Sequence, residues 1–212
     1  MMVKEQAIVF LSILAIGGCG DDGGPGVVPD PDADLTPMTD AAPTRECTLI
    51  NASYPDLGTV TGTATLNFDD PEDPTSEQYL SLQFPLNTET TPDILFVELW
   101  LDSAPFDEGA APYTVNLLGD QADLFLCGAC TYIAADFTDR NNITFNMAYN
   151  GELALSALDP TPGTGKVTGS LSNVKLHAVT TSEAGQMVVA DGCLSTVEGV
   201  TFDFDVVAAP TP

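Results

Sequence analysis

Four cysteines in the body of the chain form the first group of side chains with a chemistry of their own. They are Cys47, Cys127, Cys130 and Cys193. In an exported protein such cysteines form persistent disulfides, and four cysteines allow three pairings. We expect structural disulfides in which Cys47 and Cys193 each pair with one cysteine of the central pair. The alternative joins Cys127 to Cys130 and leaves Cys47–Cys193 as the second bond.

The stretch Cys127-Gly128-Ala129-Cys130 also has the spacing of redox-active and zinc-binding motifs. A redox-active pair of the thioredoxin type begins a helix, whose dipole lowers the pKa of the first thiol. Here strand-like residues lie on both sides of the motif. A zinc site needs a second such pair or histidines at ligand spacing, and the sequence has neither. Redox catalysis and metal binding therefore remain alternatives to a structural role.

The side chains needed for catalysis are sparse. The only histidine, His177, lies in a strand-like run, and no Gly-x-Ser-x-Gly elbow accompanies it. Asp203 and Asp205 share one strand face at about 7 Å, but such pairs arise by chance among 31 Asp and Glu residues. We therefore expect no catalytic residue and no enzyme. An envelope hydrolase with a carboxylate site is the alternative.

A loop rich in acidic residues is a candidate for calcium. Asp69, Asp70, Glu72 and Asp73 crowd one short stretch that also contains Pro71 and Pro74. Hard carboxylate oxygens gathered in a turn are the ligands that Ca²⁺ takes. The other interpretation is a solvated acidic loop that keeps a surface protein soluble. Calcium is thus the one cofactor that the sequence suggests.

The N-terminal residues have the parts of a secretory signal. Met1-Met2-Val3-Lys4 is followed by an apolar run from Ala7 to Ile16 and then by Gly17-Gly18-Cys19. A positive start, about 10 apolar residues and small residues before a break are typical of export. The apolar run is shorter than the roughly 20 residues of a membrane span. We expect residues 1–18 to be a signal peptide.

Ile16-Gly17-Gly18-Cys19 resembles the lipobox of bacterial lipoproteins, with Ile where Leu is commoner. The resemblance covers residues 1–19 only. It implies that the Cys19 thiol receives a diacylglycerol, that cleavage occurs before it, and that the new amine is usually acylated too. Two or three acyl chains, at about 0.8 kcal/mol per buried CH₂, anchor a protein firmly. The expected location is the bacterial cell envelope, with the membrane as one partner.

Residues 19–46 differ in composition from the rest of the chain. After Cys19 they include four glycines, five prolines and six aspartates. Few apolar residues are present to offset the entropy of ordering, and proline and charge repulsion extend such a segment. We expect a disordered acidic linker, then one domain over residues 47–208 and a tail over 209–212.

The domain is predicted to consist of β-strands, because apolar residues alternate with polar ones along several runs. Leu80, Leu82, Phe84 and Leu86 form one apolar row. Similar rows occur over 143–150 and 200–206, and a continuous apolar run covers Ile94 to Leu101. Further candidate strands cover 58–68, 111–118, 123–127, 130–136, 151–158, 165–178 and 185–191. Asn150-Gly151 between two alternating runs predicts a hairpin turn.

About ten short strands with turn signals between them are typical of an all-β fold. We expect an antiparallel sandwich of the jelly-roll or immunoglobulin type, with a closed barrel as the alternative. The formal charge of −26 argues against nucleic-acid binding. The predicted function is a lipid-anchored structural or interaction module with a protein or glycan partner. Exposed aromatic residues would support it, and a small-ligand carrier is a further alternative if the strands close into a barrel.

Overall fold

The computed structural model describes residues 53–73, 75–88, 92–107, 109–135, 144–182, 185–189 and 194–210. Contacts divide the chain into Met1–Thr44 and Arg45–Pro212, and every described residue belongs to the second part. Cys19, Cys47, Cys193 and the predicted signal and linker lie outside the described residues. Within the described ranges, no helix has the length and hydropathy needed to span a bilayer.

The elements follow one another in the order β1 (Ser53–Tyr54), β2 (Thr59–Phe68), β3 (Gln78–Pro85), β4 (Ile94–Trp100), β5 (Tyr113–Asn116), the 3₁₀ turn η1 (Gly119–Ala122), β6 (Ala129–Ala135), β7 (Thr144–Leu158), β8 (Lys166–Ser182), β9 (Gly185–Val188) and β10 (Leu194–Ala208). The prediction of an all-β fold is therefore confirmed.

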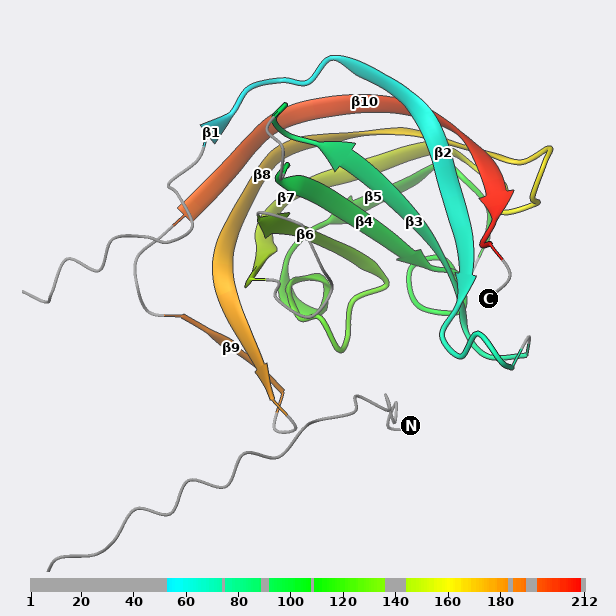
Figure 1. Cartoon of the computed structure of the whole chain (residues 1–212), viewed down its shortest axis with the longest axis horizontal. Coiled ribbons are helices and arrows are strands. Elements are labelled where there is room, and N and C mark those ends of the chain that lie inside the picture. Colours follow the sequence, from blue (N-terminus) through cyan, green and yellow to red (C-terminus); the bar gives the residue numbers. More distant parts are fainter. Residues whose placement is uncertain are drawn as a thin grey trace, which may run out of the picture. The chain divides into compact units, whose positions relative to one another are not determined.

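Seven strands form one closed ring in the order β10-β2-β3-β4-β6-β7-β8, because β10 pairs with both β2 and β8. Figure 1 shows β2 and β10 side by side in this ring. The preferred sandwich is thus wrong, and the closed barrel, its alternative, is the architecture. A sandwich keeps free edges on two facing sheets. Here the first and last long strands pair, which closes one sheet on itself and leaves no edge between them.

The closing pair β2–β10 is parallel, whereas all other neighbours in the ring are antiparallel. This follows from the odd number of strands. If direction alternates around seven strands, the first and the last point the same way. Outside the ring, β1 adds to β10, β5 adds to β7 beside β6, and β9 adds to β8.

Apolar side chains fill the interior of the barrel. The predicted row Leu80, Leu82 and Phe84 on β3 points inward, and Phe202 and Phe204 on β10 do the same. The Phe84 ring lies 5.6 Å from Phe202 and 5.2 Å from Phe204. An eight-stranded barrel has just enough room for side chains to fill it, and seven strands enclose less. The interior at this level is therefore a packed core.

The predicted hairpin at Asn150-Gly151 is wrong, because both residues lie inside β7. Gly151 has φ 130° and sits at an irregularity of the β7–β8 register. A Cβ there would lie 2.9 Å from Val174 Cα, so the close approach of β8 requires glycine. Ala148 faces the interior before this bulge and Leu153 faces it afterwards, so the inward side changes from even-numbered to odd-numbered residues. Two alternating runs that were predicted as separate strands therefore belong to one long strand.

The predicted strand over 123–127 is also wrong. These residues form turns after η1, and β6 begins at Ala129. The apolar side chains Leu124, Phe125 and Leu126 were the signal for a strand, but three consecutive apolar residues do not define a period.

Candidate functional site

A second apolar cluster lies on the outward side of the barrel wall. The cluster consists of the outward-facing residues of β4 and β6, which alternate with the inward-facing ones, and of neighbours from β3 and β7. We call its rings the outer aromatic cluster: Tyr79, Phe96, Trp100, Tyr132 and Phe145. A strand wall with apolar residues on both faces needs a second layer to cover its outer side.

Glu98 lies between two stacked pairs of this cluster. Trp100 stacks on Tyr79 at 4.6 Å and Phe96 stacks on Tyr132 at 5.2 Å. The Tyr132 hydroxyl donates a 2.8 Å hydrogen bond to Glu98 Oε1, which gives the half-buried carboxylate a partner in apolar surroundings. Phe96 and Trp100 are each 7% exposed. Both rings are therefore covered by other side chains of the protein.

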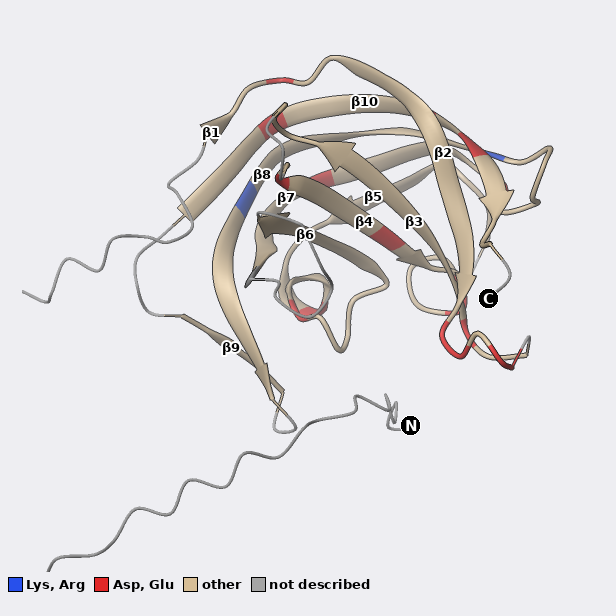
Figure 2. Cartoon of the chain, viewed as in Figure 1, with Lys and Arg blue, Asp and Glu red and all other residues tan. Residues whose placement is uncertain are grey.

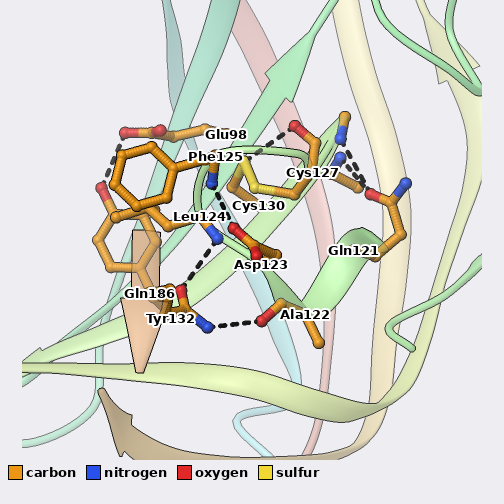
Figure 3. Close-up of a disulfide and its surroundings, with 12 residues drawn as sticks. Glu98, Gln121, Ala122, Asp123, Leu124, Phe125, Cys127, Cys130, Tyr132 and Gln186 are labelled. Carbon is orange, nitrogen blue, oxygen red and sulfur yellow. Dashed lines mark hydrogen bonds between the residues drawn. A yellow bond between two sulfur atoms is a disulfide. The ribbon is translucent and has the colours of Figure 1, made fainter. Parts of the chain in front are cut away.

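The structure pairs Cys127 with Cys130, across a Cα–Cα distance of 5.1 Å (Figure 3). The preferred pairing of each with Cys47 or Cys193 is therefore wrong. The first bond of the alternative is present, and its second bond, Cys47–Cys193, lies outside the described residues. Both cysteines are buried in the second apolar cluster, together with the rings of the outer aromatic cluster. The sequence-based expectation placed the motif between two strands. In the structure it connects the turns after η1 to β6.

Gln121 on η1 fixes the turn that the disulfide closes. Its Oε1 accepts hydrogen bonds from Gly128 N at 3.1 Å and Ala129 N at 2.7 Å (Figure 3). A Cβ on Gly128 would overlap the Ala104 carbonyl, so the position requires glycine. A redox-active Cys-x-x-Cys directs N–H groups at a helix start toward its thiolate. Here Gln121 occupies both N–H groups, which supports a structural role for the disulfide.

Gln186 joins this segment to β9, which pairs with β8. Its Oε1 accepts a 2.9 Å hydrogen bond from Leu124 N, and its Nε2 donates a 2.8 Å hydrogen bond to the Ala122 carbonyl (Figure 3). We call residues 117–128 and β9 together the outer lobe. The residues that these two bonds join lie 62 and 64 positions apart in the chain. The side chain of Gln186 thus connects the two parts of the lobe.

The outer lobe carries most of the exposed large apolar side chains of the described residues. Leu118 and Leu126 flank η1 and its turns, and Met187 and Val188 follow Gln186 on β9. More than half of the surface of each is exposed, and Leu194 at the start of β10 is the remaining exposed one. Exposed apolar side chains are candidates for a contact surface. Met187 and Val188 are consecutive residues of β9 and so point to opposite sides of that strand.

The predicted calcium residues Asp69, Asp70, Glu72 and Asp73 lie in the exposed β2–β3 loop, where acidic residues gather in Figure 2. Two of the carboxylates already cap main-chain groups, Asp70 accepting from Glu72 N and Asp73 from Thr75 N. Hydrogen bonds from the Thr75 hydroxyl and then from its N–H lower the pKa of Asp73. Among the described residues no group of three or more His, Cys, Asp or Glu could hold a metal ion. Calcium binding stays a prediction, for a titration of thermal stability to test.

Asp203 and Asp205 face outward on β10, and both contact Lys166 on β8. The Lys166 Nζ atom lies 3.0 Å from Asp203 Oδ1 and 3.1 Å from Asp205 Oδ1. Hydrogen bonds to Asp203 and then to Asp205 raise the pKa of Lys166. The two carboxylates therefore share one lysine on the outer face of the β8–β10 pair.

His177 stacks on Tyr149 with ring centroids 4.8 Å apart, on the outward faces of β8 and β7. Burial lowers the pKa of His177 below its usual 6.5. Of the four aromatic residues that were candidates for a binding surface, Trp100 and Tyr132 are buried and Tyr113 and Tyr149 are half-buried. None presents an exposed ring, so the predicted support from aromatic residues is missing.

Four polar residues are buried in the described structure: Asp93, Thr131, Asn146 and Ser195. Asp93 Oδ2 accepts a 2.6 Å hydrogen bond from the Tyr54 hydroxyl and a 3.0 Å bond from Asn87 Nδ2. Sequence reasoning missed this network and the roles of Gln121 and Gln186. Isolated polar residues in alternating runs carry no signal of the distant groups they bind.

Comparison with known proteins finds no matching family model, no matching curated protein and no matching solved structure.

Proposed function

We propose that this chain is an exported protein, anchored by acylation of Cys19, whose barrel domain binds a protein partner through the outer lobe. The observation that carries the binding role is the exposure of Leu118, Leu126, Met187 and Val188 on that lobe. The lipobox-like Ile16–Cys19 stretch and the acidic segment after it support the anchor and a flexible connection.

The way the outer lobe is held supports a recognition surface. The Cys127–Cys130 bond and the side chains of Gln121 and Gln186 fix its backbone at several points. A surface that is ordered before binding loses less conformational entropy when a partner docks. A mobile apolar loop would lack this advantage.

A protein partner fits the lobe better than a glycan. Its exposed side chains are aliphatic, and the nearby rings pack on one another within the outer aromatic cluster. Aliphatic side chains offer area for the core of a protein interface. A carrier role is less favoured, because phenylalanine rings pack together in the barrel interior.

Photo-crosslinking in the native host tests this proposal. A photoreactive residue would replace Leu126 in one full-length variant and Met187 in another. The matched control carries it at Thr61, which is exposed on β2 away from the lobe. We expect the same crosslinked protein from both lobe positions and not from Thr61. Crosslinks that are absent from the lobe, or the same at all three positions, would overturn the proposal.

A further inference from the structure

Thr131 interrupts the apolar inward row of β6, between Ala129 and Ile133. Its side chain is fully buried. Its Oγ1 is the one buried side-chain oxygen or nitrogen of the described residues that makes no hydrogen bond with the protein. Valine has the same shape and no hydroxyl, so a threonine here carries a desolvation cost unless its hydroxyl has a partner.

Apolar side chains surround this hydroxyl. The β4–β6 register pairs Thr131 with Val97. The β6–β7 register pairs Tyr132 with Met147, which places Thr131 opposite Ala148. Ala129 and Ala148 contribute only methyl groups to the interior, where most other inward positions hold Leu, Val or Phe. The side chains next to the hydroxyl on this wall are therefore apolar, and two of the four, Ala129 and Ala148, are alanine.

The nearest inward polar side chain on the neighbouring strand is that of Asn146. It is 3% exposed and lies two residues from Ala148 on the same face of β7. Residues in this diagonal relation have Cα atoms roughly 7–8 Å apart. One bridging water separates the two atoms that it joins by about 5.5 Å. The Thr131 hydroxyl and the Asn146 amide are thus arranged for a bridged contact.

We propose that the barrel interior binds a water molecule between the Thr131 hydroxyl and the Asn146 amide. Both groups can donate and accept, so the water gains the two partners that a buried water needs. The other two buried polar residues lie at the starts of strands, Asp93 directly before β4 and Ser195 as the second residue of β10. The hydrated position is therefore on the β6–β7 wall.

Magnetic relaxation dispersion of water ¹⁷O on the full chain tests this directly, because it counts long-lived internal waters. The test variant is Thr131→Val, and the matched control Thr131→Ser keeps the hydroxyl. We expect one fewer internal water in Thr131→Val and at least the wild-type number in Thr131→Ser. An equal count in the wild type and Thr131→Val would overturn the proposal, since the hydroxyl would then bind protein atoms alone.

A second measurement needs no variant. A nuclear Overhauser effect between the Thr131 methyl group and a slowly exchanging water is expected in the wild-type protein. If that effect is missing although the methyl resonance is assigned and resolved, the water does not lie at this position.

Discussion

The hydroxyl of Tyr54 donates a 2.6 Å hydrogen bond to Asp93 Oδ2, joining residues 39 positions apart. Tyr54 ends β1, the first described element after the predicted linker, and Asp93 directly precedes β4. β1 itself has only two residues in register with β10. A part-buried side-chain bond therefore fastens the start of the described domain, where main-chain pairing is short.

Replacing Tyr54 with Phe should lower the free energy of unfolding by about 1–3 kcal/mol, because the buried Asp93 carboxylate loses a donor. Urea denaturation measures this change. Tyr113→Phe is the matched control, since its half-buried ring packs on Phe106 and its hydroxyl binds no described residue. We expect the control to stay within about 0.5 kcal/mol of wild type. Equal effects of the two substitutions would contradict the role of the Tyr54–Asp93 bond.

Replacing Gln186 with Ala should loosen the outer lobe while the barrel stays folded. Both hydrogen bonds between β9 and the Ala122–Leu124 segment are lost. The loss of these two bonds should accelerate amide exchange at Leu124 about tenfold or more, because local opening then costs less free energy. Hydrogen-exchange NMR measures it residue by residue. Gln83→Ala, on the exposed face of β3, is the control and should leave exchange at Leu124 unchanged. A slow Leu124 amide in Gln186→Ala would show that other contacts hold the lobe.

His177 should make the domain less stable as the pH falls below 6.5. Burial lowers the pKa of His177 in the folded state. The unfolded chain then takes up a proton near pH 6.5 while the folded protein resists it, so unfolding is favoured from there down to the folded pKa. His177→Phe keeps a ring to stack on Tyr149 and removes the titration. We expect the melting temperature of the wild type to fall relative to this variant as the pH drops. Parallel profiles would refute the linkage.

Opening the Cys127–Cys130 bond should cost about 2 kcal/mol of stability, because the bond closes a very short loop. The double substitution Cys127→Ser, Cys130→Ser removes it, and denaturation measures the loss. Peptide mapping without reduction tests the pairing itself. With Cys127 and Cys130 joined, the sequence predicts that Cys47 and Cys193, which lie outside the described residues, form the second bond. A Cys47 or Cys193 thiol that reacts with an alkylating agent in the native protein would refute that second bond.

Alternation along the chain predicted which residues are buried, but it could not predict how the sheet ends meet. The inward rows on β3 and β10 follow from a period of two, because one face of a strand avoids water. Closure depends on β2 pairing with β10, where Val60 meets Phe202, and no local pattern records such a distant partner. A sandwich and a barrel can therefore share the same alternating strands.

The bulge at Gly151 shows a second limit of sequence reasoning. Asn-Gly favours tight turns because both residues tolerate positive φ, and a bulge uses the same property of glycine. Here the approach of Val174 from the next strand selects the bulge. The outer lobe was missed for a related reason. Gln186 binds groups more than 60 residues away, and an isolated glutamine gives no sign of them.

Membrane attachment should depend on Cys19. Its lipobox-like context predicts acylation, and two or three chains at about 0.8 kcal/mol per buried CH₂ hold a protein on a bilayer through high-salt and carbonate washes. We expect the wild type in the membrane fraction with incorporated radiolabelled palmitate, and Cys19→Ser in the soluble fraction without label. Cys127→Ser is the control for loss of a thiol and should stay membrane-bound. If Cys19→Ser remained with the membranes, another part of the chain would have to hold it there.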